Sequence, residues 1–473
     1  MKRLILPLLI TLLTGCASDP SLPEVNPHIP ANWSEESLQQ DGQAMAQLPS
    51  WRTFFPHAPL QNLIEQALAE NRDLRNALVR VKKAAAQTGV AESNRWPLVQ
   101  GVVSHQDART PADLNQNGKT SFTHRQDLLF NLPSYELDVW GRVDRMVEGA
   151  EERLLASEES WRAMRVVLMA MVVEGALAWR EAVEHVTIAN KLVENRRQVL
   201  ELYQQRHGAG LTGQRQVAEA TANLASSQAE LADWQKQEKS TYHALALLVA
   251  ANQPLNLEWP TLRELGLETP LQAGLPSQVL LQRPDIKAAE HQLLAAQGDV
   301  AAARANLFPR ITLTASGGVA SRDLAGLFAG GSGVWTFLPM ITLPIFDLPR
   351  RQLDITVMEA EQEMAQNTYE KAIQQGFREV AESLSVQTLL QDRLQATTEG
   401  VKQRYIKLGQ ARDRFQNGLD GRLELLETEK EFLQAHHPWL TAQRHHLSGR
   451  VQLFKVLGGG QEETTREIKE DDL

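Results

Sequence analysis

The chain has 473 residues, 42% of them hydrophobic and 22% charged, and its formal net charge is −10. This acidic balance, without a segment in which Lys and Arg cluster, argues against nucleic acid as a partner. The single cysteine, Cys16, excludes an internal disulfide framework and a cysteine-rich metal site.

The N-terminus has the pattern of a bacterial export signal. Two basic residues precede an apolar run at residues 4–13, which is too short to span a bilayer permanently. The run ends in the motif LTGC at residues 13–16, which resembles a lipobox. We therefore expect residues 1–15 to be a lipoprotein signal peptide and Cys16 to carry a covalent lipid. By resemblance to bacterial lipoproteins, Ala17 rather than Asp in the next position implies sorting to the outer membrane. The alternative is an uncut leader with an incidental cysteine.

Residues 16–55 are rich in Pro, Ser, Gln and Asn, which indicates an extended, acylated N-terminal segment. Apolar residues then recur at helical spacing from about residue 59 to residue 95. We expect this helix to end before Pro97, because a proline biases the preceding residue away from helix.

The residues that follow have the alternation of strands. Within 97–140 apolar and polar residues alternate, and a polar stretch at 106–121 without periodicity predicts a loop between two strands. Each strand has about ten residues, the length that a tilted membrane strand requires. Residues 142–253 contain no proline and are predicted to form one long helical hairpin, whose tip is 207–213.

The same order of elements occurs twice. The first repeat spans 56–253, a proline-containing connector covers 254–275, and the second repeat spans 276–457. In the second repeat the two strands lie within 309–346 and the hairpin tip is 416–421. Each repeat therefore consists of a helix, two strands and a long helical hairpin.

Three residue offsets relate the repeats. An offset of 212 matches Trp96 with Phe308, an offset of 206 matches Trp140 with Phe346, and an offset of 208 aligns the turn glycines. These aromatic residues stand where helix meets strand, as residues at a membrane interface do. A hairpin helix of roughly 66 residues would be about 100 Å long, which no compact domain needs. The acidic tail, 458–473, is predicted to be disordered.

The strands of the second repeat have the pattern of a membrane barrel. Apolar residues on one face alternate with Thr and Ser on the other, as in residues 311–316. Four strands cannot close a barrel, and lipid does not tolerate an open sheet edge, so the chain must pool strands with copies of itself. The alternative is an amphipathic hairpin packed on a soluble core.

Together these features resemble the TolC-type outer-membrane factors, in particular the NodT-like lipoprotein branch. The resemblance rests on the LTGC leader, the helix stops at 94–97 and 306–309, the strand exits DVWGR at 138–142 and PIFD at 344–347, and the paired turns of the form Arg-x-x-x-Gly-Leu. It covers about residues 55–457. It implies a mainly α fold with a small transmembrane β part, in which a trimeric 12-strand β-barrel is continued by a periplasmic α-helical coiled-coil barrel.

The resemblance also implies a function. The chain is expected to be the outer-membrane channel component of a tripartite efflux system, a passive duct without enzymatic activity. Its implied partners are two sister copies in a homotrimer, a periplasmic adaptor protein, an inner-membrane efflux pump of the RND type, and outer membrane lipid. The implied location is the bacterial outer membrane, with a lipid anchor on Cys16, no other cofactor, and a large periplasmic part.

The hairpin tips are the predicted functional site. Four acids follow one another at spacings of 4, 3 and 4, on one helical face: Asp420, Glu424, Glu427 and Glu431. If this face points inward, symmetry repeats it into carboxylate rings that favour cations. The resemblance implies that Glu424 and Glu427 are acids of the lumen, and the alternative is a solvated outer face.

One departure from the family pattern concerns the contact that closes the tips. The family pairs an arginine on the second turn with an acid on the first, near a tyrosine. This chain has Asp420 on the second turn, Arg215 and Gln216 on the first, and Phe415 in place of the tyrosine. We hypothesise an inverted ion pair from Arg215 to Asp420. These four residues and the two lumen acids make up the predicted periplasmic aperture.

The glycines and leucines of the two turns resemble the adaptor-facing tips of the family. We expect the glycines to allow positive φ angles in the turns. The alternative is that these residues serve turn geometry only. The predicted adaptor contacts are Gly208, Gly210, Leu211, Gly418, Leu419 and Gly421.

A periplasmic adaptor (membrane fusion) lipoprotein of the same kind of system is the alternative function. An adaptor would have one hairpin flanked by soluble β-domains, and the two repeats speak against it. An enzyme is less consistent with the sequence, which has no nucleophile elbow, phosphate loop or HExxH motif. His437 and His445 would lie about 12 Å apart along their helix, too far to share a metal ion, so no metal site is predicted.

Overall fold

The computed structural model describes residues 49–255, 259–265, 267, 280–281, 283–343 and 345–459. The predicted signal peptide, Cys16, and most of the N-terminal segment, the connector and the C-terminal tail lie outside the described residues. The chain divides into two compact units. The sheet unit contains Val81–Ser157 and Ala289–Glu370, and the hairpin unit contains the described residues up to Arg80, Glu158–Ala288 and those from Lys371 onward.

Within the described residues, three helices precede the first strand: α2 (Trp51–Phe54), α3 (Ala58–Glu70) and α4 (Arg72–Ser93). The single helix expected from 59 to 95 is therefore divided at Asn71. The Oδ1 atom of Asn71 accepts hydrogen bonds from the backbone N–H groups of Asp73 (2.9 Å) and Leu74 (3.1 Å). This side chain caps the start of α4, so that a new helix begins there.

The short helix α2 belongs to the hydrophobic core of the hairpin unit. Phe54 stacks on Phe454 of α9 (Arg422–Val456), with ring centroids 4.6 Å apart. Trp51 is fully buried in the same core. We expected the whole of 16–55 to be extended, but its last described part forms this buried helix. The reason is that its aromatic side chains find apolar partners on a helix some 400 residues away in the chain.

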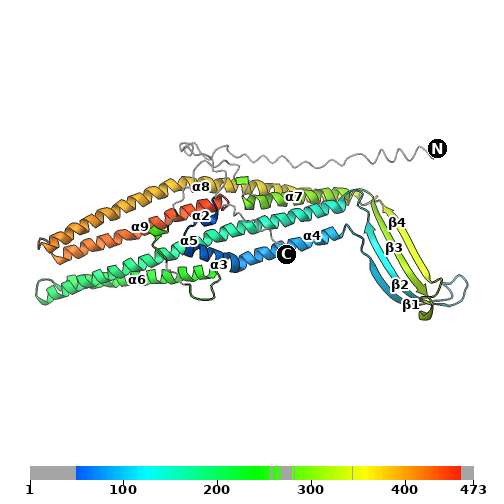
Figure 1. Cartoon of the computed structure of the whole chain (residues 1–473), viewed down its shortest axis with the longest axis horizontal. Helices are drawn as coiled ribbons and strands as arrows, with labels where there is room; N and C mark the ends of the chain where they lie inside the picture. The colour runs from blue at the N-terminus through cyan, green and yellow to red at the C-terminus, as the bar shows by residue number, and fades with distance from the viewer. Residues whose placement is uncertain are drawn as a thin grey trace. The chain divides into compact units, whose positions relative to one another are not determined.

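Two long helical hairpins carry the tips. The first consists of α5 (Arg142–Gly208) and α6 (Gln214–Leu248), and the second of α8 (Leu348–Gln416) and α9 (Figure 1). Helix α7 (Pro284–Ala305) precedes the second pair of strands. Among the described residues, no helix is both long enough and apolar enough to cross a membrane.

The sheet unit holds one antiparallel sheet in the order β1-β2-β3-β4, which Figure 1 shows with the strands side by side. The strands are β1 (Gln100–Thr110), β2 (Ser121–Glu136), β3 (Arg310–Ser321) and β4 (Gly333–Thr342). The loop expected at 106–121 is shorter than predicted, because β1 continues to Thr110. The polar residues at the end of β1 pair with polar residues of β2. For example, His124 Nδ1 lies 2.6 Å from a carboxylate oxygen of Asp107.

The register places the predicted apolar residues of the second repeat on one face. Ile311 pairs with Ile341, and Ala315 pairs with Phe337. Residues directly opposite in a ladder share a face, so β3 and β4 form one apolar surface there. Pro133 lies where the β2–β3 register shifts, which is where a strand can accommodate a residue without an N–H group.

Candidate functional site

The two hairpin turns have the same backbone geometry. The N–H of Leu211 donates to the carbonyl of Arg206 (2.8 Å), and the N–H of Leu419 donates to the carbonyl of Arg414 (2.9 Å). In each turn the glycine before the leucine donates to the carbonyl three residues earlier. This is the Schellman pattern of a helix C-terminus, so the repeated Arg-x-x-x-Gly-Leu sequence encodes one turn twice.

Only one glycine in each turn has a positive φ angle. Gly210 has φ +72° and Gly418 has φ +71°. Gly208 is the last residue of α5, and Gly421 precedes α9 with φ −81°. The expectation that all four glycines adopt positive φ is therefore corrected. Gly210 and Gly418 are each the second residue after their helix ends, and a residue with a side chain would be strained at these two positions because the turn requires a positive φ angle there.

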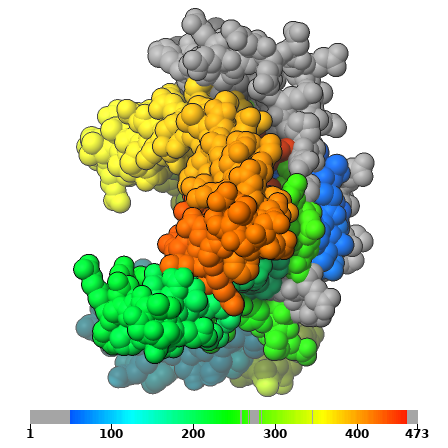
Figure 2. Space-filling view, turned by 90° about the vertical axis from the view of Figure 1, so that its left-hand side faces the viewer, coloured from blue at the N-terminus to red at the C-terminus, as the bar shows by residue number. Residues whose placement is uncertain are grey.

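Each turn presents one apolar side chain to solvent. Leu211 is 78% exposed and Leu419 is 67% exposed. Figure 2 shows the end of the hairpin unit at which the turns lie, with the α5–α6 turn in green and the α8–α9 turn in orange. Below the turns, Val199, Ala220 and Leu426 pack together and join α5, α6 and α9. The exposed leucines are thus held on a packed base.

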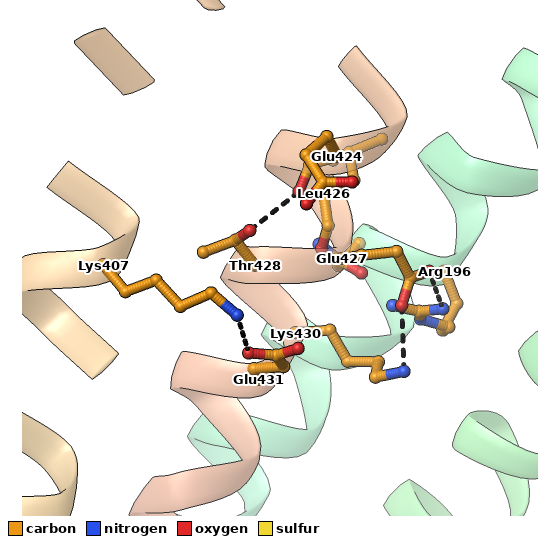
Figure 3. Close-up of polar contacts among 9 residues, drawn as sticks. Arg196, Lys407, Glu424, Leu426, Glu427, Thr428, Lys430 and Glu431 are labelled. Atoms are coloured by element: carbon orange, nitrogen blue, oxygen red, sulfur yellow. Dashed lines mark hydrogen bonds and ion pairs between the residues drawn. The ribbon is translucent and has the colours of Figure 1, made fainter. Parts of the chain in front are cut away.

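The predicted acidic stripe is largely neutralised by basic residues. The partners come from three helices: Asp420 binds Arg414, Glu427 binds Arg196 and Lys430, and Glu431 binds Lys407. Figure 3 shows the last two groups. Glu424 is exposed and makes no ion pair with any described residue. The stripe is therefore a series of ion pairs with one free carboxylate, rather than a line of uncompensated charge.

The contact between Arg196 of α5 and Glu427 of α9 joins the two repeats. Its Nη1–Oε1 distance is 2.8 Å, and the Arg196 side chain is only 6% exposed. Burial by itself would raise the pKa of Glu427, but the hydrogen bonds from Arg196 and Lys430 outweigh it and lower that pKa. The pair therefore stays ionised at any pH above the usual range of a glutamate.

A second polar contact lies beside this pair. The amide nitrogen of Asn195 donates to the carbonyl of Leu426 (2.9 Å) and to a carboxylate oxygen of Glu429 (3.2 Å). Asn195 is buried, and the Nε and Nη2 atoms of Arg196 are buried without a hydrogen-bond partner among the described residues. Two polar residues of α5 thus hold α9 near the tips, at an energetic cost that an apolar contact would not carry.

The hypothesised ion pair between Arg215 and Asp420 is not formed in this structure. Both oxygens of Asp420 accept from Arg414 on the same hairpin, at 2.7 and 2.8 Å, and this guanidinium holds the pKa of Asp420 below its usual range. Arg215 and Gln216 are exposed on the first turn of α6, and Arg215 makes no ion pair with a described residue. Phe415 is partly exposed beside the second turn.

The basic partners of the stripe were missed by the sequence reasoning. A signal was present, since Leu192 and Val199 are apolar positions of α5 at helical spacing, and Asn195 and Arg196 interrupt that stripe. Polar residues at core positions of a helix indicate a buried polar contact. The sequence could not reveal its partner, which lies 231 residues further along the chain.

The described residues contain no cluster of three or more His, Cys, Asp or Glu side chains arranged to hold a metal ion. The tip region offers ion pairs, a free carboxylate and two exposed leucines. Exposed apolar side chains of this kind are suited to contacts with other molecules.

Known proteins match this chain over both repeats. The sequence model of a family described as outer membrane efflux protein matches residues 63–251 and 275–459. Outer membrane protein OprJ of Pseudomonas aeruginosa is 33% identical over 459 residues, covering 96% of this chain and 95% of OprJ. The toluene efflux pump outer membrane protein TtgF of Pseudomonas putida is 34% identical over 458 residues, covering 95% of each chain.

A solved structure has the same fold. The open state of the Neisseria gonorrhoeae MtrE outer membrane channel has a TM-score of 0.83 and 30% sequence identity, covering 95% of this chain and 100% of the MtrE chain. The predicted fold class, a tandem repeat of helices with a small β part, is thereby confirmed.

Proposed function

The chain belongs to the outer membrane efflux protein family, and from this premise we propose that it forms a passive trimeric duct whose inner end is closed by ion pairs. It is the outer-membrane channel component of an efflux system, located in the bacterial outer membrane with a large periplasmic part. The alternative function as an adaptor is rejected, because the family match extends over both repeats.

The strand order supports the trimer. Strands β1 and β4 are the two edges of the sheet, and an edge cannot stay unpaired in lipid. Pairing β4 of one copy with β1 of the next closes the sheet, and three copies supply 12 strands. The apolar face of β3 and β4 then contacts outer membrane lipid. Cys16, by its place in the lipobox, carries the lipid anchor.

The hairpin tips suit a docking surface for partner proteins. Leu211 and Leu419 stand exposed on two turns of identical geometry, so a partner with a repeated apolar contact would engage both. We assign this partner as a periplasmic adaptor, which connects the duct to an inner-membrane pump of the RND type. The turn glycines contribute by keeping both leucines in the same orientation.

The aperture is formed by the residues beside the turns. Glu424 is its free carboxylate and favours cations, while Arg215, Gln216 and Phe415 line the opening. The Arg196–Glu427 pair and the Asn195 contacts hold α9 against α5 and keep the aperture narrow. An Arg215–Asp420 pair would add to this closure only in an assembly where Asp420 leaves Arg414.

The observation that carries this proposal is the Arg196–Glu427 contact, and the test is the conductance of single channels in planar bilayers. We expect Arg196→Met to raise the ratio of open to closed time about tenfold, because a hydrogen bond to a charged group contributes roughly 1.5 kcal/mol. The variant also leaves Glu427 with Lys430 as a remaining partner, which keeps the helix folded.

The matched control is Arg197→Met. Arg197 is the next residue of α5, is exposed, and pairs only with Glu194 of its own helix among the described residues. Its removal should leave the open-to-closed ratio unchanged. Equal behaviour of the two variants would contradict the proposed closure. A wild-type protein that inserts no channel at all would contradict the duct itself.

A further inference from the structure

An aromatic contact joins the two repeats at the base of the sheet. Trp140, just after β2, stacks on Phe308, just before β3, with ring centroids 5.0 Å apart and an interplanar angle of 20°. The indole Nε1 of Trp140 donates to the carbonyl of Pro309 at 2.8 Å. The contact therefore stands beside the β2–β3 ladder, where the first repeat pairs with the second.

The repeat relation assigns a counterpart to each ring. The offset of 212 relates Phe308 to Trp96, and the offset of 206 relates Trp140 to Phe346. Trp96 is 76% exposed and Phe346 is 96% exposed. Neither ring stacks on another ring among the described residues. The two halves of a second contact are therefore present, but they do not meet within one chain.

The unpaired rings stand at the two edges of the sheet. Trp96 precedes the edge strand β1, and Phe346 follows the other edge strand, β4. The internal contact accompanies the joining of β2 to β3, so its counterpart would accompany the joining of β4 to β1. A sheet of four strands cannot curl far enough to join its own edges, so the second ring must come from another copy.

The two joins differ in chemistry. At the internal join, Glu136 binds Arg142 (2.8 Å) and also Arg310 of the other repeat (2.7 Å). The same offsets place Thr342 opposite Leu98 at the edges, so no ion pair is available there. Leu98, which precedes β1, is an exposed large apolar residue, and so are Leu343 and Ile345, which follow β4. The two edge strands therefore have apolar residues where the internal join between β2 and β3 has an ion pair.

We propose that Phe346 of one copy stacks on Trp96 of the next copy, and that this aromatic seam repeats head to tail around the ring. The partner is a second copy of this chain, bound through unlike surfaces as closed rings require. The exposed apolar residues beside both rings extend the seam and add buried area. This inference rests on the proposed trimer and names the residues that hold it together at the membrane interface.

Photo-crosslinking of the full-length protein in membranes tests the seam. With p-benzoylphenylalanine at position 96, we expect ultraviolet light to yield covalent dimers and trimers on a denaturing gel. The same residue at position 140 faces Phe308 of its own chain and should yield crosslinked monomers only. Oligomeric products from position 140 and none from position 96 would overturn the inference.

A double-mutant cycle provides a second readout. Trp96→Ala and Phe346→Ala should each lower the temperature at which heated trimers dissociate on a gel, by several degrees. The double variant should fall no further than the lower single variant, because both remove one contact. Phe130→Ala, which removes an exposed aromatic residue from an inner strand, is the control and should add its effect to either single.

The outcomes separate the seam from the trimer. Additive effects of Trp96→Ala and Phe346→Ala, in a wild-type protein that still runs as a trimer, would refute the seam and leave the duct intact. A wild-type protein that is monomeric in native detergent extracts would refute the proposed trimer and the seam together.

Discussion

At the residue scale, the acidic tip illustrates how a local pattern acquires its meaning from distant partners. The spacing of Glu424 and Glu427 places them on one helical face of α9, whereas Asp420, which was expected on the same face, lies in the turn before α9 begins at Arg422. Their charge state is decided elsewhere, since Glu427 meets Arg196 of the first repeat. Of the four acids of the stripe, only Glu424 makes no ion pair with a described residue.

Two neighbouring glycines of β3 show a different residue-scale constraint. A Cβ atom on Gly318 would lie 2.1 Å from the carbonyl oxygen of Leu128 and 2.9 Å from the Cα of Leu129. A Cβ atom on Gly317 would meet nothing within 4 Å. The backbones of β2 and β3 therefore approach closely at Gly318, on the ladder that joins the repeats.

We expect Gly318→Ala to impair assembly, because the clash is with backbone atoms that can yield only by separating β2 from β3. The yield of heat-dissociable oligomers in the membrane fraction should fall several-fold, as a displaced strand pair costs more than about 1 kcal/mol. Gly317→Ala adds the same Cβ atom at the adjacent position, where it would meet no other atom within 4 Å, and this variant should assemble like the wild type. Equal yields of the two variants would contradict this account.

At the element scale, polar and aromatic contacts join the long helices α5, α6 and α9 at one position along their length. His185 of α5 and His437 of α9 lie parallel, with their Nδ1 atoms 2.7 Å apart, and Trp234 of α6 stacks on His185 at 3.8 Å between centroids. The carboxylates of Glu181 and Glu230 lie 3.6 and 3.9 Å from the outer nitrogens of the two imidazoles. Three helices meet in this one stack.

The histidine stack predicts a pH-dependent stability. Burial, and secondarily the positive charge that His185 would carry, lowers the pKa of His437 to about 4. Arg444 of α9, paired with Glu181, adds another cation nearby. Between pH 6.5 and pH 4 the imidazole of His437 is protonated in the unfolded chain and neutral in the folded chain. Stability should therefore be full above about pH 6.5 and decline as the pH falls toward 4.

The measurement is the thermal midpoint of the detergent-solubilised protein at pH 7 and at pH 5. We expect His437→Gln to show a smaller decline between these values than the wild type, since it removes the titrating group. His243→Gln, at an exposed position of α6, should keep the wild-type decline. The idea fails if His437→Gln and His243→Gln decline alike.

At the scale of the whole molecule, the duplication determines the number and order of the strands and helical hairpins. Each repeat supplies two strands and one hairpin, and the two hairpin turns have the same pattern of backbone hydrogen bonds. The sheet ends at the edge strands β1 and β4, and this observation underlies the proposed trimer. The hairpin helices are long, with 67 residues in α5 and 69 in α8.

The lipid anchor is a whole-molecule prediction, because it concerns where the assembled protein resides. We expect cells grown with radiolabelled palmitate to label the wild type but not Cys16→Ala, since the thioether and amide acyl groups both depend on that cysteine. Ala17→Asp is the control: it should stay labelled but move from the outer to the inner membrane fraction. Label retained by Cys16→Ala would refute the lipobox assignment.

Features with a local cause were predicted from the sequence alone. Helical periodicity, strand alternation and the Gly-Leu turns each depend on residues within a few positions, so the tandem repeat and the fold class were confirmed. Local patterns also located the candidate tips. They misjudged the end of β1 and the division at Asn71, where polar side chains find partners outside the periodic pattern.

The tertiary structure alone decided which distant residues meet. Arg196 with Glu427, Trp140 with Phe308, and Phe54 with Phe454 are contacts between segments far apart in sequence. The energy of such contacts depends on burial and on the positions of atoms that no single stretch determines. The amino-acid sequence therefore determined the elements and their duplication. The packing of these elements against one another determined which charges are paired and which surfaces are left exposed.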